Sequence, residues 1–337
     1  MTRIWTVAFC GAGNVVRNHH LPALEERGDR YRVVGFFDVD GQKARERAGD
    51  KYKVYGQYRE LLADRDVEIV VVATKPLATH YPAARDALAA GKHVLLEKPM
   101  ASTTAECDAL LDLAREKGRL LTVHHNRRLD LDFLAMQDLI RKGKVGEPAF
   151  IENRVPCDGY DGGDFVDWGV HLADQALLLN RSALVEVSGF LAKPAEGVAN
   201  GGYGEGTLRF ERPPLVRIAM MPRCQEFLLN GTPAAARFYV AGSLASFTQR
   251  VIEDPRDLMN ATVSFDRARP DYAVPAYLEV RRKGYYDYLY ESLSQGAPLL
   301  VKAEQARNAI RLLELLGESA KANRAIPASK MLPVPVD

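Results

Sequence analysis

Two groups of residues have types and spacing that suit acid–base chemistry. Lys98 follows the short apolar segment His93–Leu96, within the tripeptide Glu97-Lys98-Pro99. Asp167 and His171 stand four residues apart in a segment with helical periodicity, so both side chains project from one helix face. An imidazole can take a proton from a hydroxyl near neutral pH, and a lysine in a partly dry cleft can polarise an oxygen. We therefore predict Lys98, Asp167 and His171 as catalytic residues. The alternative for Asp167 and His171 is a structural hydrogen bond, and Asp174, three residues after His171, is a second carboxylate that could orient the imidazole.

A glycine-containing segment near the N-terminus has the properties of a phosphate-binding loop. Gly11-Ala12-Gly13-Asn14-Val15 lies between a predicted strand and a predicted helix. Gly11 permits a tight turn, and Gly13 lets the backbone approach a pyrophosphate, which the helix N-terminus attracts. Val16 stands where glycine or alanine is usual, so an ordinary tight turn is the alternative interpretation.

Two carboxylates are placed to contact a ribose. Asp38 ends the second predicted strand, near the distance from the glycines at which a carboxylate accepts from adenosine ribose hydroxyls. A carboxylate there repels a 2′-phosphate, so NAD is favoured over NADP; a solvated strand end is the alternative. We expect Glu97 to accept from a ribose as well, because ligands of open parallel sheets bind beyond the carboxyl ends of the strands.

The elements that must position these residues alternate between strands and helices up to about residue 124. The predicted strands are Ile4–Cys10, Tyr31–Asp38, Val67–Ala73, His93–Leu96 and Leu120–His124. The predicted helices are Val15–Arg27, Gly41–Ala48, Pro82–Ala90 and Thr103–Lys117. This alternation predicts an α/β domain with a doubly wound parallel sheet, a Rossmann domain, over residues 1–124.

The remainder, residues 125–337, has a different pattern. Repeated short strands between about Val185 and Thr248 predict a large, open, mainly antiparallel sheet in an α+β domain. We assign substrate binding to this second domain. The other predicted elements are the strand Ala149–Val155 and the helices Asp130–Arg141, Phe165–Leu179, Tyr277–Gln295 and Ala303–Lys321.

Composition excludes several classes of partner. The 337 residues are 47% hydrophobic and 26% charged with a net charge of +1, so we expect neither nucleic acid nor a membrane as partner. No apolar run approaches the ~20 residues that cross a bilayer, and with no signal-peptide pattern we expect a cytoplasmic protein. The four cysteines have no zinc-like spacing. The pairs His19-His20 and His124-His125 lack an acidic residue at a suitable spacing, so we predict no metal.

The chain resembles the glucose–fructose oxidoreductase / inositol dehydrogenase / rhizopine-catabolism (Gfo/Idh/MocA) family over nearly its whole length. The motifs that carry the resemblance are Gly11-x-Gly13 with His19, Asp38, Val70–Pro76 with His80, Glu97-Lys98-Pro99, Asn126-Arg127-Arg128, Gly143–Pro148 and Asp167-x-x-x-His171. Within the family, the chain most resembles a branch that contains scyllo-inositol dehydrogenases. The stretch between Val155 and Asp167, where that branch predicts substrate contacts, is short here, and parts of the branch use NADP.

The resemblance implies the same catalytic group, Lys98, Asp167 and His171, and a sugar, polyol or sugar-derived ketone as substrate. It implies homodimers or homotetramers formed through the outer face of the C-terminal sheet. The residues that we predict to bind the cofactor are Gly11, Gly13, Asn14, Val15, Asp38, Thr74, Pro76, His80, Glu97, Lys98 and Asn126.

Three functions are compatible with these residues. The first is an NAD(P)-dependent dehydrogenase or reductase that acts on CH–OH groups. The second is a glycosidase that oxidises and re-reduces its sugar with bound NAD, and it differs in that NADH does not accumulate. The third is a catalytically silent NAD-binding sensor, since fold does not determine function; Lys98, Asp167 and His171 argue against it.

Overall fold

The chain folds as two compact units. The structure, a computed structural model, describes residues 3–143, 146–156, 165–192, 203–221, 236–242, 246–250 and 283–333. The first unit comprises residues 1–125 and 283–307, and the second comprises residues 126–282 and 308–337. The sequence analysis assigns all of residues 125–337 to one domain. The structure differs, because residues 283–307 belong with the first unit.

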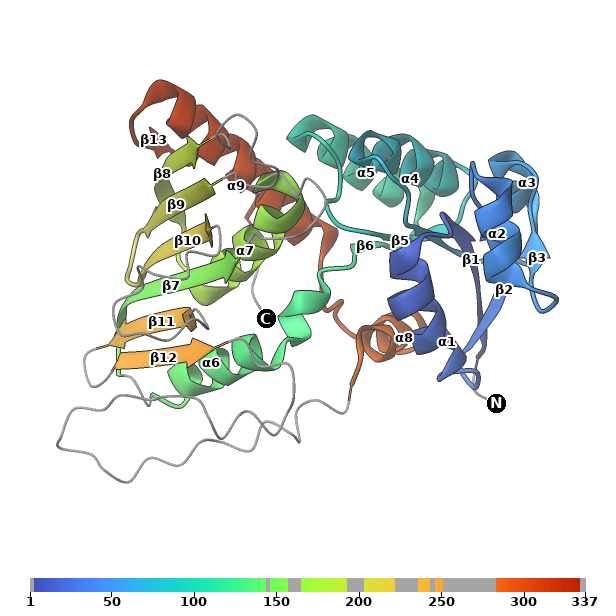
Figure 1. The fold of residues 1–337 in the computed structure, drawn as a ribbon, viewed down its shortest axis with the longest axis horizontal. Coiled ribbons are helices and arrows are strands. Elements are labelled where there is room, and N and C mark those ends of the chain that lie inside the picture. Colours follow the sequence, from blue (N-terminus) through green and yellow to red (C-terminus); the bar gives the residue numbers. More distant parts are fainter. Residues whose placement is uncertain are drawn as a thin grey trace. The chain divides into compact units, whose positions relative to one another are not determined.

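A six-stranded parallel sheet forms the centre of the first unit (Figure 1). The strand order is β3-β2-β1-β4-β5-β6, and all neighbours are parallel. The strands are β1 (Trp5–Cys10), β2 (Tyr31–Phe37), β3 (Lys53–Val54), β4 (Ile69–Val72), β5 (His93–Leu96) and β6 (Leu121–Val123). The predicted doubly wound parallel sheet is confirmed. Its order reverses between β1 and β4, the point at which such sheets bind ligands.

Short helices connect these strands. They are η1 (Val16–His20), α1 (Leu21–Glu25), α2 (Gly41–Ala48), α3 (Tyr58–Ala63), η2 (Leu77–Thr79), α4 (His80–Ala89) and α5 (Thr104–Lys117). Side chains that cap backbone amides explain two of the starts: Asp40 caps α2, and Thr103 with Glu106 forms a capping box at α5. The sequence analysis missed β3 and α3, because elements of two and six residues show too little periodicity.

Helix α8 (Tyr285–Gln295) belongs to the first unit although it is distant in sequence. The guanidinium groups of Arg27 and Arg30 both lie 2.8 Å from the carboxylate of Asp287. Burial raises the pKa of this carboxyl, but the hydrogen bonds and charge of the arginines outweigh burial and lower it. The start of α8 is therefore attached to the segment after α1 by ionic contacts.

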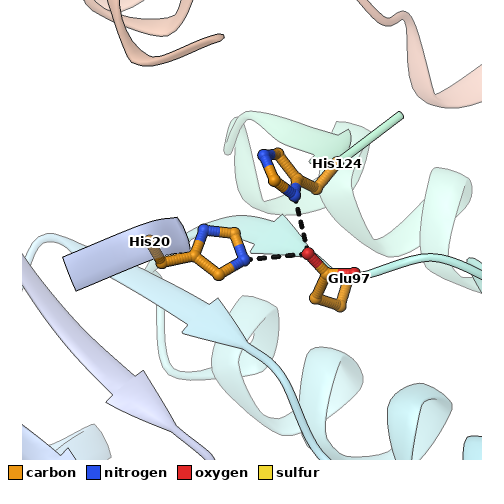
Figure 2. Close-up of side chains that lie close together, drawn as sticks. All are labelled: His20, Glu97 and His124. Carbon is orange, nitrogen blue, oxygen red and sulfur yellow. Dashed lines mark hydrogen bonds and ion pairs between the residues drawn. The ribbon is translucent and has the colours of Figure 1, made fainter. Parts of the chain in front are cut away.

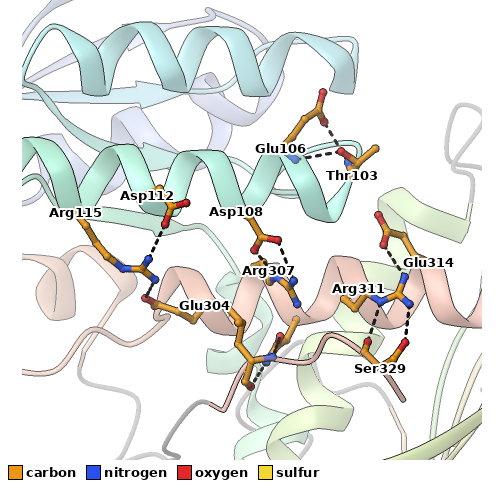
Figure 3. A network of polar contacts seen from close by, with 12 residues as sticks. Thr103, Glu106, Asp108, Asp112, Arg115, Glu304, Arg307, Arg311, Glu314 and Ser329 are labelled. Carbon is orange, nitrogen blue, oxygen red and sulfur yellow. Dashed lines mark hydrogen bonds and ion pairs between the residues drawn. The ribbon is translucent and has the colours of Figure 1, made fainter. Parts of the chain in front are cut away.

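Helix α9 (Ala303–Ala322) begins in the first unit, alongside α5 (Figure 3). Arg307 donates to both carboxylate oxygens of Asp108, at 2.7 and 3.1 Å. Arg115 of α5 reaches Glu304, one helical turn before Arg307, at 3.4 Å. Together with the contacts of α8, these ion pairs explain why residues 283–307 return to the first unit.

The second unit contains a seven-stranded sheet in the order β12-β11-β7-β10-β9-β8-β13. Only β7 and β10 pair in parallel among these strands, which confirms a mainly antiparallel sheet. The strands are β7 (Pro148–Pro156), β8 (Leu184–Ala192), β9 (Tyr203–Phe210), β10 (Leu215–Met221), β11 (Ala236–Gly242), β12 (Ser246–Arg250) and β13 (Ile326–Pro327). Its first helices are η3 (Asn126–Leu129), α6 (Leu131–Arg141) and α7 (Phe165–Leu179).

The C-terminal part of α9 packs closely on this sheet. A Cβ atom at Gly189 of β8 would lie 2.4 Å from the carbonyl oxygen of Leu316, and one at Gly206 of β9 would lie 2.6 Å from the Leu316 side chain. The backbone amide of Gly189 donates to the Ser319 hydroxyl at 3.0 Å. Glycine is therefore required at Gly189, where a side chain would push the helix backbone away, whereas a side chain at Gly206 would displace the Leu316 side chain.

Candidate active site

The glycine loop follows β1 at the point where the strand order reverses. Gly11 has a φ of 108°, which favours glycine, and its amide donates to the Phe37 carbonyl at 2.7 Å. A Cβ atom at Gly11 would lie 2.2 Å from the carbonyl oxygen of Ala73, just after β4. No larger residue fits here unless the ends of β1 and β4 separate.

The space beside Gly13 is open, since a Cβ atom there would meet nothing within 4 Å. The helix then starts at Asn14 and Val15. Val16, at the position where glycine or alanine is usual, is fully buried and begins a π-helical turn that ends at His20. A π-helical turn is wider than an α-helical one, which accommodates the larger side chain. The tight turn and the open space together fit a dinucleotide pyrophosphate.

Asp38 follows β2 and directs its carboxylate toward the glycine loop. One oxygen accepts from the Ala12 amide at 2.8 Å, and the other accepts from the Asp40 amide at 2.9 Å. Asp38 is therefore fixed beside the loop rather than being a simple solvated strand end. The guanidinium of Arg47 also reaches this loop, donating to the Ala12 carbonyl at 3.2 Å.

The loops after β4 and β5 are connected through His80. Its Nε2 lies 2.9 Å from the Thr74 carbonyl oxygen, and its Nδ1 lies 2.7 Å from the Pro99 carbonyl oxygen. His80 is only 3% exposed, whereas Pro76, in the same loop as Thr74, is exposed. Both ring nitrogens of His80 face protein carbonyls, which only accept, so the ring links the two loops in the form that carries a proton on each nitrogen. Its predicted contact with the cofactor, like those of Thr74 and Pro76, stays a prediction.

Glu97 lies inside the protein and is 7% exposed (Figure 2). Its Oε1 lies 2.8 Å from His20 Nε2 and 2.6 Å from His124 Nδ1. Its Oε2 accepts from the Lys98 amide at 3.2 Å. The sequence analysis expected this carboxylate to accept from a ribose. In the structure it accepts from two histidines and from the next backbone amide, because distant elements bring these donors to it.

Electrostatics keep the Glu97 carboxylate ionised. Burial would raise the pKa of Glu97, but the electrostatic effect of His124 and the hydrogen bonds from His124 and His20 outweigh burial, and the pKa lies well below its usual value. Burial lowers the pKa of His20, and its Nδ1 lies 2.7 Å from the Tyr286 hydroxyl. A neutral His20 that donates to Glu97 through Nε2 accepts from Tyr286 through Nδ1.

The same three residues, His20, Glu97 and His124, have their potential ligand atoms within 4.8 Å of one another. This corrects the sequence analysis, which found no acidic residue to accompany these histidines. Glu97 Oε1 is 2.8 Å from His20 and 2.6 Å from His124, which are hydrogen-bond distances. Ligands around zinc are about 3.3 Å apart when the bonds are about 2.0–2.1 Å long. The geometry therefore suits a hydrogen-bonded cluster better than a metal centre.

Helix α7 carries both Asp167 and His171, as predicted. Asp167 is half-buried and His171 is 5% exposed. The ring of Trp168 lies 6.0 Å from the ring of His171 and is covered on one face by the guanidinium of Arg127 at 4.7 Å. These two candidate residues therefore share one helix, whose polar side contacts η3.

Arg128 attaches α7 to η3 through a buried ion pair. Its guanidinium donates to both oxygens of Asp174, at 2.8 and 2.5 Å, and the two side chains are 5% and 2% exposed. The sequence analysis considered Asp174 as a possible carboxylate for orienting His171; here its oxygens accept from Arg128. Gln175 adds an amide contact, donating to the Arg127 carbonyl at 2.8 Å and accepting from Asn153 at 2.9 Å.

The candidate residues fall into two sets. The larger set lies in the first unit, with Lys98 half-buried at the end of β5. Asp167, His171 and the exposed Asn126 lie in the second unit, so their association with Lys98 stays a prediction. Residues 157–164, where substrate contacts are predicted, and Tyr277, the predicted start of a helix, lie outside the described residues.

The parallel sheet and this loop define a class of protein, those with a dinucleotide-binding Rossmann domain. Residues 5–125 match the model of the Gfo/Idh/MocA family, described as an oxidoreductase family with an NAD-binding Rossmann fold. The chain is a dehydrogenase or reductase whose first unit contains an NAD(P)-binding Rossmann domain similar to that of this family. Among the described residues, no helix is long and apolar enough to cross a membrane.

Similar proteins cover different shares of the chain. The scyllo-inositol 2-dehydrogenase (NADP(+)) IolW of Bacillus subtilis is 29% identical over 95% of this chain and 95% of its own length. An uncharacterized oxidoreductase of Schizosaccharomyces pombe is 35% identical, but the match spans 51% of this chain and 50% of that protein. The crystal structure of an NAD-binding protein from Listeria innocua has a TM-score of 0.78 at 26% identity, covering 96% of each chain.

Proposed function

We propose that the protein transfers a hydride reversibly between a nicotinamide and a carbinol carbon of a sugar, cyclitol or related polyol. The observation that carries the proposal is the glycine loop with Asp38 fixed beside it, at the strand edge that also bears Lys98. The dinucleotide, when bound, supplies the hydride donor or acceptor. The name of the Bacillus subtilis relative supports a cyclitol as substrate.

Three side chains have distinct roles in this proposal. His171 takes the hydroxyl proton when the carbinol is oxidised and returns it in the reverse direction. Lys98 donates a hydrogen bond to the same oxygen and stabilises the charge that develops on it. Asp167 accepts from a neighbouring substrate hydroxyl. Burial of His171 on α7 supports its role, because a shielded base is less solvated.

The proposed cofactor is NAD rather than NADP. Asp38 is held by two amides, so its carboxylate stays beside the loop and repels a 2′-phosphate. Substitution Asp38→Asn should tighten NADP binding by about fivefold or more, because two unit charges 4 Å apart interact by about 1 kcal/mol even in water. The control is Asp29→Asn, at the opposite end of β2, which should leave the ratio of NAD to NADP affinity unchanged. Tighter binding of NADP than NAD by the unmodified protein would contradict the preference.

Two measurements test the function itself. The protein is titrated with NAD and with NADP, and binding is followed by the rise in its thermal midpoint. NADH formation is then recorded with scyllo-inositol, myo-inositol and a series of aldoses. NADH that accumulates with one of these polyols supports the proposal. NAD binding without turnover, combined with cleavage of a glycoside, would favour the glycosidase. Absence of binding by either nucleotide would exclude both.

The proposal includes a homodimer or homotetramer formed through the outer face of the second sheet. Phe190 of β8 is 54% exposed and Leu215 of β10 is 36% exposed, and large apolar side chains on an open sheet favour association. Light scattering of the purified protein should give two or four times the 37.4 kDa mass of the chain. A monomer at micromolar concentration would contradict this part of the proposal.

A further inference from the structure

Buried groups hold the backbone on the N-terminal side of Lys98. The Glu97 carboxylate accepts from His20 at 2.8 Å and from His124 at 2.6 Å through one oxygen. Through its other oxygen it accepts from the Lys98 amide at 3.2 Å. A single carboxylate thus connects the backbone of Lys98 to two side chains that are distant in sequence.

The C-terminal side of Lys98 is held as well. The carbonyl oxygen of the next residue, Pro99, lies 2.7 Å from Nδ1 of His80. The other nitrogen of that ring lies 2.9 Å from the Thr74 carbonyl oxygen, so a ring with a proton on each nitrogen ties the loop after β5 to the loop after β4. Lys98 is therefore fixed between two points, while its own side chain is half-buried.

The three histidines come from three different elements of the first unit. His20 ends η1, His80 begins α4 and His124 follows β6. They are 0%, 3% and 6% exposed. His20 and His80 have both ring nitrogens against protein atoms, so these two histidines can act on a substrate only through the loop that they hold.

We infer that His20, His80 and His124, together with Glu97, form a clamp that positions Lys98 for its action on the substrate oxygen. The inference rests on the proposed function, because it assumes that Lys98 contacts that oxygen. A lysine side chain has several rotatable bonds, so the position of its Nζ depends on a fixed backbone. Misplacing a reacting group by about 1 Å can lower the rate by about 10²-fold.

A double-mutant cycle tests the clamp, with NAD and scyllo-inositol as the assayed pair. Glu97→Gln keeps the size of the side chain but removes its charge. It should lower kcat by about 10-fold to 10²-fold while KM and the affinity for NAD change by less than about threefold. In the Lys98→Ala background the same substitution should cause little further loss, because the residue that it positions is gone.

Conservative variants separate positioning from general damage to the fold. His124→Asn keeps a donor near the place of Nδ1 and should retain most of kcat, whereas His124→Leu should behave like Glu97→Gln. His93→Asn is the matched control. His93 is the first residue of β5, whereas Glu97 follows the last residue of that strand, so His93 lies at the opposite end of β5 from Lys98. This variant should therefore retain full kcat. Thermal midpoints of all variants verify that they are folded.

The outcomes separate the two proposals. If Lys98→Ala retains normal turnover, the proposed role of Lys98 fails and the clamp fails with it. If Lys98→Ala is impaired but the loss from Glu97→Gln is unchanged in that background, only the clamp is overturned. A stoichiometric transition metal in the purified protein, lost in His124→Leu, would also overturn it, because the cluster would then be a metal site.

A readout without turnover covers the case in which scyllo-inositol is not a substrate. Lysines of the folded protein are labelled with ¹³C-methyl groups, and the Lys98 signal is assigned by its absence in Lys98→Ala. The clamp predicts a Lys98 signal separate from those of exposed lysines, which moves toward them in Glu97→Gln. An identical Lys98 signal in both proteins would contradict the inference.

Discussion

The two units support their candidate catalytic residues with different buried chemistry. Behind Lys98, one carboxylate, that of Glu97, accepts from two histidines. On the helix of Asp167 and His171, support comes from an arginine that donates to both oxygens of an aspartate. The first cluster contains two histidines, and burial lowers the pKa of one of them, His20. The second is a buried ion pair between an arginine and an aspartate.

This difference indicates what each cluster is suited to hold. A planar guanidinium that forms two parallel hydrogen bonds fixes the orientation of its partner. This suits α7, which must keep the side chains of Asp167 and His171 on one side. Each histidine forms single hydrogen bonds in different directions, which suits the loop of Lys98, because this loop is joined to η1, α4 and the end of β6. The arginine cluster should therefore contribute more to stability, and the buried or half-buried histidines of the first unit, His20 and His93, should make stability depend on pH.

The largest expected effect is on the arginine cluster. Arg128→Met leaves Asp174 buried without its main partner, and should lower the free energy of unfolding of the second unit by about 3–5 kcal/mol. Urea unfolding would be followed in a Trp5→Phe background, in which Trp168 is the only tryptophan of the chain. The double substitution Arg128→Met with Asp174→Leu should recover most of the loss. An unchanged urea midpoint for the single variant would show that this pair does not hold α7.

The next effect concerns catalysis, where both units should matter equally. Lys98→Ala or His171→Ala should each lower kcat by at least about 10²-fold, because each removes a group that we propose to act on the substrate oxygen. Binding of NAD should survive in both, which fluorescence titration measures. Near-normal turnover in both variants would contradict the catalytic assignment, and a loss in only one would restrict it to that unit.

The smallest effect is on the pH dependence of stability. Burial, assisted by the charge of Arg119, lowers the pKa of His93 from 6.5 to about 4, and its Nδ1 accepts from the Leu120 amide at 3.0 Å. The unfolded chain binds a proton below pH 6.5 that the folded chain does not. This contribution to stability is therefore complete above pH 6.5 and is lost as the pH falls toward 4. The lowered pKa of His20 acts in the same direction.

Urea midpoints at pH 7.5, 5.5 and 4.5 measure this loss. His93→Asn should make stability less dependent on pH, because it keeps an acceptor near Nδ1 that does not bind protons. His19→Asn changes an exposed histidine and should leave the dependence unchanged. A His93→Asn protein whose midpoint falls as steeply as that of the unmodified chain would show that this histidine is not responsible.

Local patterns were enough to predict much of the site. The glycine loop, the carboxylate of Asp38 at the end of a strand and the four-residue spacing of Asp167 and His171 each depend on a few neighbouring residues. Their geometry follows from turn, strand and helix periods, and the structure has the loop, the strand end and the helix at these positions. The same periods predicted the strand–helix alternation of the first unit, and missed only elements too short to repeat a pattern.

The partners of buried polar groups could not be predicted in this way. Glu97 lies 77 residues from His20 and 27 from His124, and Arg128 lies 46 residues from Asp174. A buried charge must find donors wherever the packing of distant elements supplies them, and periodicity carries no information about such pairs. The sequence alone thus determined the fold class, the dinucleotide loop and the candidate residues. The tertiary structure decided that Glu97 and His80 face inward to hold loops, since only packing selects which distant groups meet.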